Sequence, residues 1–147
     1  MRVLSDDEWR DHDFADQRVG VIADGDDAAR IVPWALRSAT SVKVFQREPT
    51  WVSPVRIPLV RGVAARLNLR FSVKDPWTRR LLTPGRFGPG AVTLSRCYYR
   101  AIQRPNCTLV AWPVCALTDQ GVRTAEGIEH RLDCLVITRT ARQELAA

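Results

Sequence analysis

The sequence has few of the residues from which metal sites and disulfide frameworks are built. It contains four cysteines and two histidines among its 147 residues. The cysteines, Cys97, Cys107, Cys115 and Cys134, are far apart and form no CxxC pair, which favours free thiols over a metal site. No serine or cysteine stands in a pattern with a partnered base. We therefore predict no metal site and no catalytic residue on this chain.

Long apolar runs are also absent. No stretch of 18 apolar residues occurs, so we predict no membrane span. The first residues, MRVLSDDEWRDHD, are too acidic for a signal or transit peptide, and we expect a cytoplasmic protein. With 46% hydrophobic residues the chain can bury one core of its own.

Acidic residues are scarce outside the N-terminal part. Residues 1–27 hold nine acids and three bases, whereas residues 56–104 hold eleven bases and one acid, Asp75. Such a basic stretch is typical of phosphate or nucleic-acid binding. We favour the alternative of an arginine-rich surface that pairs with the acidic N-terminus, because no zinc-finger spacing, recognition helix or aromatic stacking motif accompanies it. Nucleic acid is therefore not an expected partner.

Residues 18–47 carry the pattern around which the chain is organised. The β-branched run VGVI at residues 19–22 predicts a short buried strand, and residues 41–45 predict a second one. Between them, apolar positions on one helical face predict a helix: Ala28, Ile31, Val32, Ala35 and Ala39. Arg47 follows the second strand. This order is typical of a dinucleotide-binding βαβ unit, in which an arginine at the last position accommodates the 2′-phosphate of NADP.

The turn before that helix keeps only part of the phosphate-binding pattern. G-x-G-x-x-G/A is represented by ADGDDA at residues 23–28, in which Gly25 and Ala28 match and the first glycine is Ala23. Three carboxylates surround the place of a pyrophosphate: Asp24, Asp26 and Asp27. Carboxylates there stabilise a helix by roughly 0.5–2 kcal/mol but repel an anion. For Gly25, close approach to a pyrophosphate and a simple tight turn remain open, and we favour the turn.

The remaining segments predict an α/β domain. Residues 1–17 are expected to be an irregular acidic lead-in, and residues 18–147 a single domain. Residues 57–71, 75–82 and 95–104 predict helices, and residues 107–111 predict a third parallel strand. In the first of these helices the arginines are expected on the outer side, because apolar residues repeat every four positions at Leu59, Val63, Leu67 and Phe71.

The C-terminal part has a different pattern. Short runs at residues 114–117, 121–124 and 129–132 are separated by turn residues and predict an antiparallel meander. Residues 132–138 predict a final buried strand. We therefore predict a Rossmann-like three-layer α/β domain with a parallel sheet and a small antiparallel β-meander near the C-terminus.

Several unrelated short motifs occur along the chain in a fixed order. They are VGVI at 19–22, IVP at 31–33, VKVFQR at 42–47, LTP at 82–84, QRPN at 103–106 and GVRTA at 121–125. With these motifs the chain resembles the NADPH-binding domain of flavin-dependent monooxygenases, most closely the Baeyer–Villiger type, from Trp9 onwards. The resemblance implies NADP(H) as cofactor, with the cofactor-binding residues Gly25, Asp26, Asp27, Ala28, Gln46 and Arg47.

The sequence also departs from that family. Of the fingerprint FxGxxxHTxxWP only Trp9 matches, and TRT at residues 138–140 replaces the ATG motif of the domain crossing. Glu48 replaces a threonine beside Arg47, where its carboxylate would repel the 2′-phosphate. The insertion after the second strand is shortened, and no FAD-binding segment is recognised, so FAD is not expected on this chain. The resemblance therefore implies a truncated, degenerate, stand-alone domain.

Three hypotheses follow. In the first, the chain is an NADP(H)-binding-type domain that is not catalytic alone. It is either a remnant with weak or lost cofactor binding or one part of a split oxidoreductase whose FAD domain is another polypeptide. In the second, it is a non-catalytic interaction or oligomerisation protein that associates with a partner or with itself through the surface that faces the FAD domain in the family. The third, a nucleic-acid binder, has only bulk charge in its favour.

Overall fold

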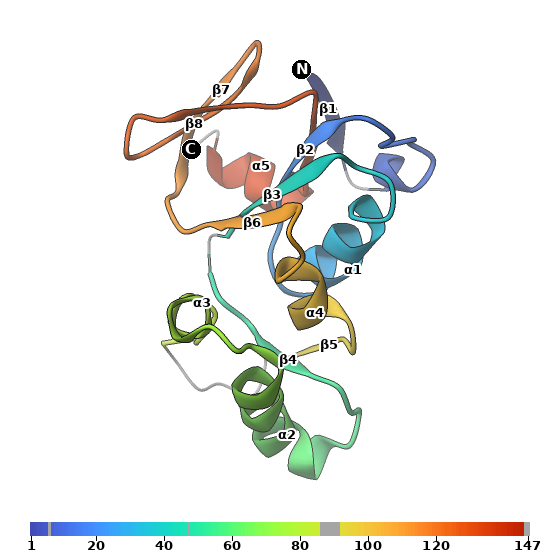
Figure 1. Ribbon diagram of the computed structural model, residues 1–147, viewed down its shortest axis with the longest axis vertical. Coiled ribbons are helices and arrows are strands. Elements are labelled where there is room, and N and C mark those ends of the chain that lie inside the picture. The colour runs from blue at the N-terminus through green and yellow to red at the C-terminus, as the bar shows by residue number, and fades with distance from the viewer. Residues whose placement is uncertain (6, 47, 86–91, 146–147) are drawn as a thin grey trace.

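The central element of the fold is a parallel sheet of five strands (Figure 1). A computed structural model describes residues 1–5, 7–46, 48–85 and 92–145. The strand order is β1-β10-β2-β3-β6, and all four pairings are parallel. The bounds are β1 (Arg2–Ser5), β2 (Arg18–Ile22), β3 (Ser41–Phe45), β6 (Cys107–Val110) and β10 (Cys134–Ile137).

The inner strands β10 and β2 are buried on both faces, as is usual for a parallel sheet, whereas the edge strands β1 and β6 are partly exposed. Side chains alternate between the two faces because successive residues of a strand point in opposite directions. In β2, Val19 and Val21 belong to the larger core and Ile22 to a second core on the opposite face. In β10, Cys134 and Val136 face the larger core in the same way.

Helices cover one face of the sheet. α1 (Gly25–Ala35) packs there with α4 (Tyr98–Ile102), and the short 3-10 helix η1 (Glu8–Arg10) adds Trp9 to the same core. The apolar face predicted for α1 is confirmed for Ala28, Ile31, Val32 and Ala35, which are buried. Ala39, the fifth predicted residue, is also buried but lies beyond the end of the helix.

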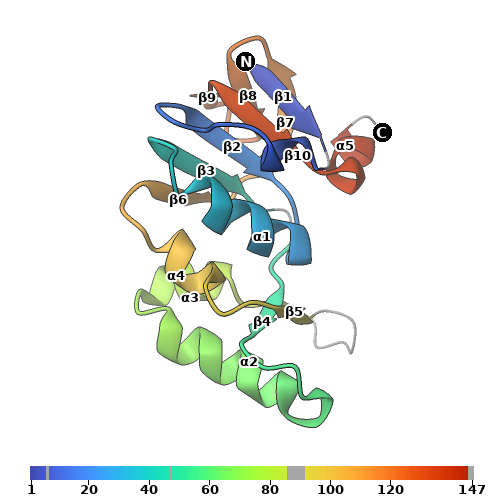
Figure 2. The same cartoon turned by 90° about the vertical axis from the view of Figure 1, so that its right-hand side faces the viewer.

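The antiparallel meander covers the other face. It consists of β7 (Val114–Thr118), β8 (Gly121–Thr124) and β9 (Glu129–Arg131), and α5 (Arg139–Leu145) follows β10. Val122 and Ala141 pack on this side against Leu135 of the sheet. Figure 2 shows the resulting helix, sheet and meander layers. The predicted three-layer α/β fold with a C-terminal meander is confirmed.

A smaller unit lies below the sheet in both views (Figures 1 and 2). It contains β4 (Trp51–Ser53) and β5 (Val92–Leu94), which pair in parallel, and the helices α2 (Pro58–Ser72) and α3 (Pro76–Leu81). The sequence pattern predicted both helices but not the two strands. None of the helices within the described ranges is long and apolar enough to cross a membrane.

The predicted orientation of α2 is wrong. The apolar repeat expected to face inward is exposed, with Leu59 94%, Val63 62%, Leu67 47% and Phe71 74% accessible. The buried residues of α2 are Ala65 and Leu69. Small Ala65 permits close packing on β4, so the helix buries this side and leaves the larger side chains outside.

The expectation of an irregular lead-in is also wrong for residues 2–5. These residues form β1, which pairs with β10 at the edge of the sheet. β10 offers a free strand edge, and the Arg2 N–H donates to the Asp133 carbonyl at 2.9 Å. The pairing partner lies more than 100 residues away, so no local pattern indicates it. The boundary between residues 17 and 18 stays a prediction.

We expect Gly121→Ala to destabilise the meander strongly. A Cβ at this position would overlap the His130 carbonyl oxygen, and backbone has little freedom to retreat. Overpacking of this kind costs about 1–3 kcal/mol. Gly85→Ala is the matched control, because no atom of the described residues lies within 4 Å of the place that its Cβ would take. Urea unfolding of both variants measures the difference, and equal midpoints would contradict the β8–β9 geometry.

We also expect acid to weaken the link between β2 and β10. The Arg18 side chain and backbone N–H donate to the Asp133 carboxylate, which lowers the pKa of Asp133 to about 2. The aspartate of an unfolded chain titrates at about 3.9, so this stabilisation is complete above about pH 4 and is lost as the pH falls towards 2. Both side chains are about half exposed, so solvent screening keeps the contribution small.

Urea unfolding at pH 5 and pH 3 tests this link. Asp133→Asn is expected to lose less stability than the unmodified protein between the two pH values. Asp119→Asn removes an exposed carboxylate that does not contact Arg18 and is the control. An identical loss in Asp133→Asn and the unmodified protein would refute the role of the pair.

Candidate functional site

The first turn of α1 lies outside the carboxyl ends of β2 and β3, where open α/β sheets place their ligands. The chain enters the helix through Gly25, whose φ of +52° lies in the left-handed region that favours glycine. Thr93 Oγ1 would lie 3.4 Å from a Cβ at this position, an ordinary van der Waals contact. Backbone conformation rather than crowding therefore requires this glycine.

Carboxylates surround this helix start. Asp24 is the N-cap residue, but its side chain makes no capping hydrogen bond, and its Oδ1 accepts from the Glu48 N–H at 3.5 Å. Asp26 is exposed in the first turn, and Asp27 pairs with Arg30 at 2.6 Å. Negative charge already occupies the position at which a helix N-terminus attracts an external anion.

The pocket beside the helix start is almost filled. Its free volume is about 10 Å³, close to the least space that holds one water molecule. Apolar and aromatic groups from separate segments occupy it, mainly Val52, Leu82 and Tyr98. Burial raises the pKa of Tyr98, with Asp24 contributing in the same direction, so the phenol stays neutral. The only charged residues among the described lining are Asp24 and Glu48.

Gln46 reaches this pocket from the end of β3. Its Nε2 donates to the Leu81 carbonyl at 3.3 Å, whereas its Oε1 is buried and has no hydrogen-bond partner among the described residues. The predicted 2′-phosphate ligand, Arg47, lies outside the described residues.

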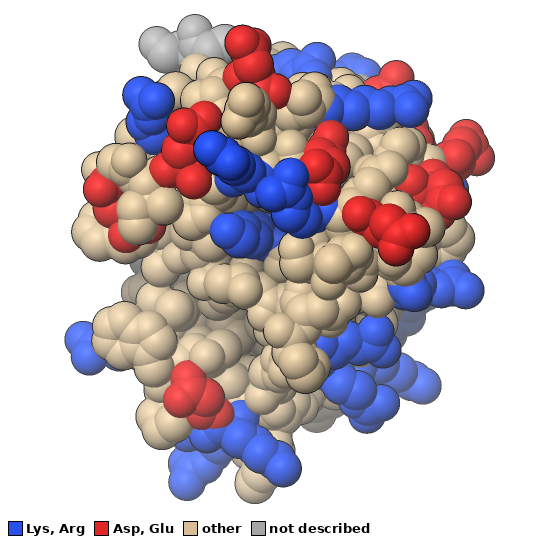
Figure 3. All heavy atoms as spheres, turned by 45° about the horizontal axis from the view of Figure 1, so that its top comes forward, with Lys and Arg blue, Asp and Glu red and all other residues tan. Residues whose placement is uncertain are grey.

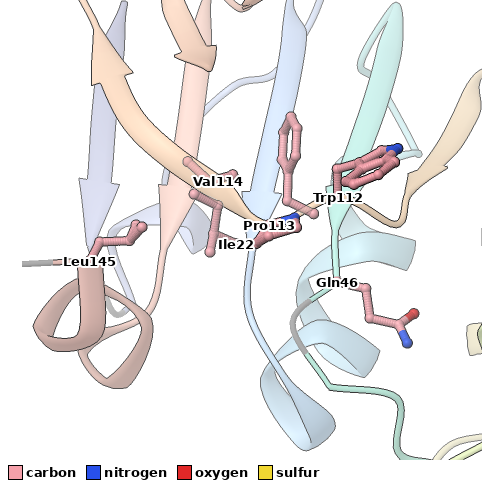
Figure 4. Close-up of a pocket in the computed structure, with 7 residues that line it drawn as sticks. Ile22, Gln46, Trp112, Pro113, Val114 and Leu145 are labelled. Atoms are coloured by element: carbon pink, nitrogen blue, oxygen red, sulfur yellow. The ribbon is translucent and has the colours of Figure 1, made fainter. Parts of the chain in front are cut away.

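A second pocket opens on the meander side of the same sheet edge (Figure 4). Its volume is about 170 Å³, and its lining is mostly apolar. Ile22 and Phe45 come from the sheet, Trp112 and Pro113 from the segment before β7, and Val114 from β7 itself. Gln46 lines this pocket as well. The volume is below the range of about 300–1,000 Å³ usual for small-molecule sites.

The structure thus brings five of the six predicted cofactor-binding residues to one place. Gly25, Asp26, Asp27 and Ala28 form the first turn of α1, and Gln46 lines the pocket beside it. Sequence reasoning missed the residues that fill the pocket, because Leu82 and Tyr98 come from distant segments. As placed, the described residues do not fit a pyrophosphate, which needs both volume and positive potential here.

The chain is similar in sequence to known monooxygenases. No family model matches the chain. A Baeyer–Villiger monooxygenase of Streptomyces coelicolor is 27% identical over 179 aligned positions, and one of Pseudomonas aeruginosa is 26% identical over 179. Both alignments cover 92% of this chain and 34% of the relative. The chain therefore spans about a third of the length of these relatives.

Among solved structures, an oxidised steroid monooxygenase bound to NADP superimposes with a TM-score of 0.79 and 19% identity. The superposition covers 93% of this chain and 41% of that one. At this identity the similarity establishes the fold.

Proposed function

Because the chain is homologous to the Baeyer–Villiger and flavin monooxygenases over 92% of its length, we propose that it is an NADP(H)-type nucleotide-binding domain of this lineage with weakened or lost cofactor binding. In this proposal the chain does not catalyse monooxygenation alone. The reaction needs flavin and nicotinamide held side by side, and the flavin is held by another polypeptide or by a further part of the protein.

The observation that carries the proposal is the cluster of carboxylates at the start of α1. Asp24 and Glu48 line the pocket, and Asp26 and Asp27 stand in the first helical turn. A carboxylate about 4 Å from a phosphate repels it by about 4 kcal/mol at an effective dielectric constant of 20. A helix N-terminus attracts an anion by only about 0.3–1 kcal/mol. Repulsion by Asp24, Asp26 and Glu48 therefore opposes the attraction of the helix start, while Arg30 offsets the charge of Asp27.

Two retained features favour weak binding over complete loss. Gly25 keeps the positive φ with which a turn presents its backbone to a ligand. Arg47 keeps, in the sequence, the position from which an arginine accommodates the 2′-phosphate of NADP. A dinucleotide that bound here would have to displace Tyr98 or Leu82 from the pocket.

Titration calorimetry with NADPH and NADP⁺ tests the proposal. The unmodified protein is expected to show no binding tighter than millimolar, about −4 kcal/mol. Asp24→Asn/Asp26→Asn/Asp27→Asn removes three charges, while asparagine remains a good capping residue. We expect this variant to bind at least about tenfold more tightly, and Arg47→Ala within it to reverse the gain.

A matched control removes three exposed carboxylates away from α1: Asp11→Asn/Asp119→Asn/Glu126→Gln. It changes the net charge equally and is expected to leave binding unaltered. Micromolar binding of NADPH to the unmodified protein would contradict the proposal. Equal gains in both triple variants would show that net charge, rather than the α1 cluster, sets the affinity.

The exposed apolar stripe of α2 favours a second role, self-association. Leu59, Val63, Leu67 and Phe71 recur every four residues on one face of this helix. Exposure of such a stripe to water is unfavourable, and packing against the same helix of a second copy would bury these side chains. The arginines of the same helix oppose close pairing of two copies, so we expect the association to be weak and to strengthen with salt.

Sedimentation velocity over a range of concentrations measures this association. We expect the unmodified protein to form dimers reversibly, and Leu59→Ser/Val63→Ser to remain monomeric. Leu117→Ser/Ile128→Ser is the control, because those side chains are 46% and 51% exposed on the meander side of the molecule. A monomer at every concentration and salt level would refute self-association through α2.

A further inference from the structure

A hollow of about 610 Å³ lies between α2, α4 and the segments that flank α4. It shares no lining residue with the pocket at the start of α1. Four cationic side chains line it, Lys74, Arg96, Arg100 and Arg104, and no carboxylate does so among the described residues. We call this hollow the basic groove.

The positive charge of the basic groove is not compensated within the described structure. The Lys74 and Arg100 side chains make no hydrogen bond or ion pair with a described residue. Arg96 Nε and Arg104 Nη1 donate to neutral backbone carbonyls, at 3.4 Å to Pro54 and 3.3 Å to Leu36. Figure 3 shows lysine and arginine side chains predominating over the lower part of the molecule.

The expected pairing of this stretch with the acidic N-terminus is not found among the described ion pairs. These pairs are Arg10–Asp7, Arg18–Asp133 and Arg30–Asp27, and none includes a residue of the basic stretch 56–104. The acid of that stretch, Asp75, caps α3 by accepting from the Thr78 N–H and hydroxyl. Asp75 is not among the residues that line the basic groove.

The spacing of the arginines adds to the electrostatic cost. Arg96 precedes α4, Arg100 lies within it and Arg104 follows it, and all three line the same hollow as Lys74, so like charges lie close together there. A chain that needed only a solvated surface at this place would gain stability from an acid in the series. We take the absence of a carboxylate from the described lining as support for an anionic ligand at this place.

The walls of the groove are held in place without a ligand. Gln103, which ends α4, donates to the Ser72 and Tyr99 carbonyls at 2.8 and 2.7 Å and accepts from the Lys74 N–H at 3.3 Å. These bonds fix the end of α2 against the end of α4. The cations therefore project from a preorganised frame, which lowers the entropic cost of binding.

We propose that the basic groove binds a small polyanion that carries two or more phosphate groups. Guanidinium groups donate pairs of parallel hydrogen bonds to phosphate oxygens, and Lys74 adds a point charge. The volume lies within the range of about 300–1,000 Å³ usual for small-molecule sites. A single-stranded nucleic acid needs exposed aromatic rings for stacking, but Tyr99 in this groove is 3% exposed and its hydroxyl accepts from the Val52 N–H.

Titration calorimetry with inorganic triphosphate in 50 mM NaCl tests the groove. The unmodified chain is expected to bind it at micromolar concentration, and Lys74→Gln/Arg100→Gln to bind about 30-fold more weakly. These two side chains have no partner among the described residues, so the double change leaves the fold intact, and an unchanged thermal midpoint verifies this. Arg123→Gln/Arg131→Gln removes the same charge from β8 and β9 and is expected to bind less than threefold more weakly.

Equal weakening in both double variants would overturn the proposal, because bulk charge would then explain the binding. Absence of binding below millimolar concentration would overturn it as well. Two further probes, a 20-nucleotide single strand and phosphatidylserine vesicles, identify the class of ligand. Binding of either that depends on Lys74 and Arg100 more strongly than triphosphate binding does would replace the small polyanion with that macromolecule.

The result does not depend on the proposed function at α1. The Asp24→Asn/Asp26→Asn/Asp27→Asn variant keeps the basic groove unchanged and is expected to bind triphosphate as the unmodified protein does. Clearly tighter triphosphate binding in that variant, which Lys74→Gln/Arg100→Gln added to it did not weaken, would place the phosphate site at α1 and overturn the proposal for the groove.

Discussion

β10 lies between β1 and β2, so the parallel sheet is continuous only when the last strand of the chain has paired with the first two. Its four residues are at most 1% exposed. Arg18 and Asp133 join β2 to the segment before β10 across 115 residues of sequence. Because β10 occupies one side of β2 and β3 the other, the start of α1 lies over the middle of the sheet. This pairing positions the candidate site, since the turn that begins α1 follows β2 and Gln46 follows β3.

The elements that the sequence predicts correctly are those whose burial pattern is local. β2 and β10 are mainly apolar runs buried on both faces, β3 buries Val42, Val44 and Phe45, and α1 has one apolar face. Their own residues therefore determine their structure. β1, β4 and β5 contain three or four residues each, and β1 is mostly exposed. They are strands only because a partner strand lies beside them. A local sequence pattern does not indicate a distant partner strand. Trp51, for example, pairs with Val92, which is 41 positions away.

The helix α2 illustrates a different limit. Its apolar repeat correctly predicts a helix, but the repeat does not determine which face the rest of the protein covers. Packing against β4 selects Ala65 and Leu69, because a small residue lets the helix approach closely. The candidate site follows the same rule. The turn residues could be located from their spacing around Gly25, whereas Tyr98 and Leu82, which fill the pocket, depend on tertiary packing.

The acidic N-terminal segment and the basic segment 56–104 lie at two different sites in the structure. They were expected to pair with each other. The acidic segment surrounds the helix start at which this fold ordinarily attracts phosphate, and the basic segment lines a separate hollow. None of the ion pairs Arg10–Asp7, Arg18–Asp133 and Arg30–Asp27 joins the two segments, and no carboxylate is among the described residues that line the basic groove. Each region therefore keeps its own potential, negative beside α1 and positive between α2 and α4. If both proposals hold, this fold does not bind phosphate at the backbone N–H groups of the α1 start, where nearby carboxylates repel it. It binds phosphate instead through the lysine and arginine side chains of the basic groove, whose described lining contains no carboxylate.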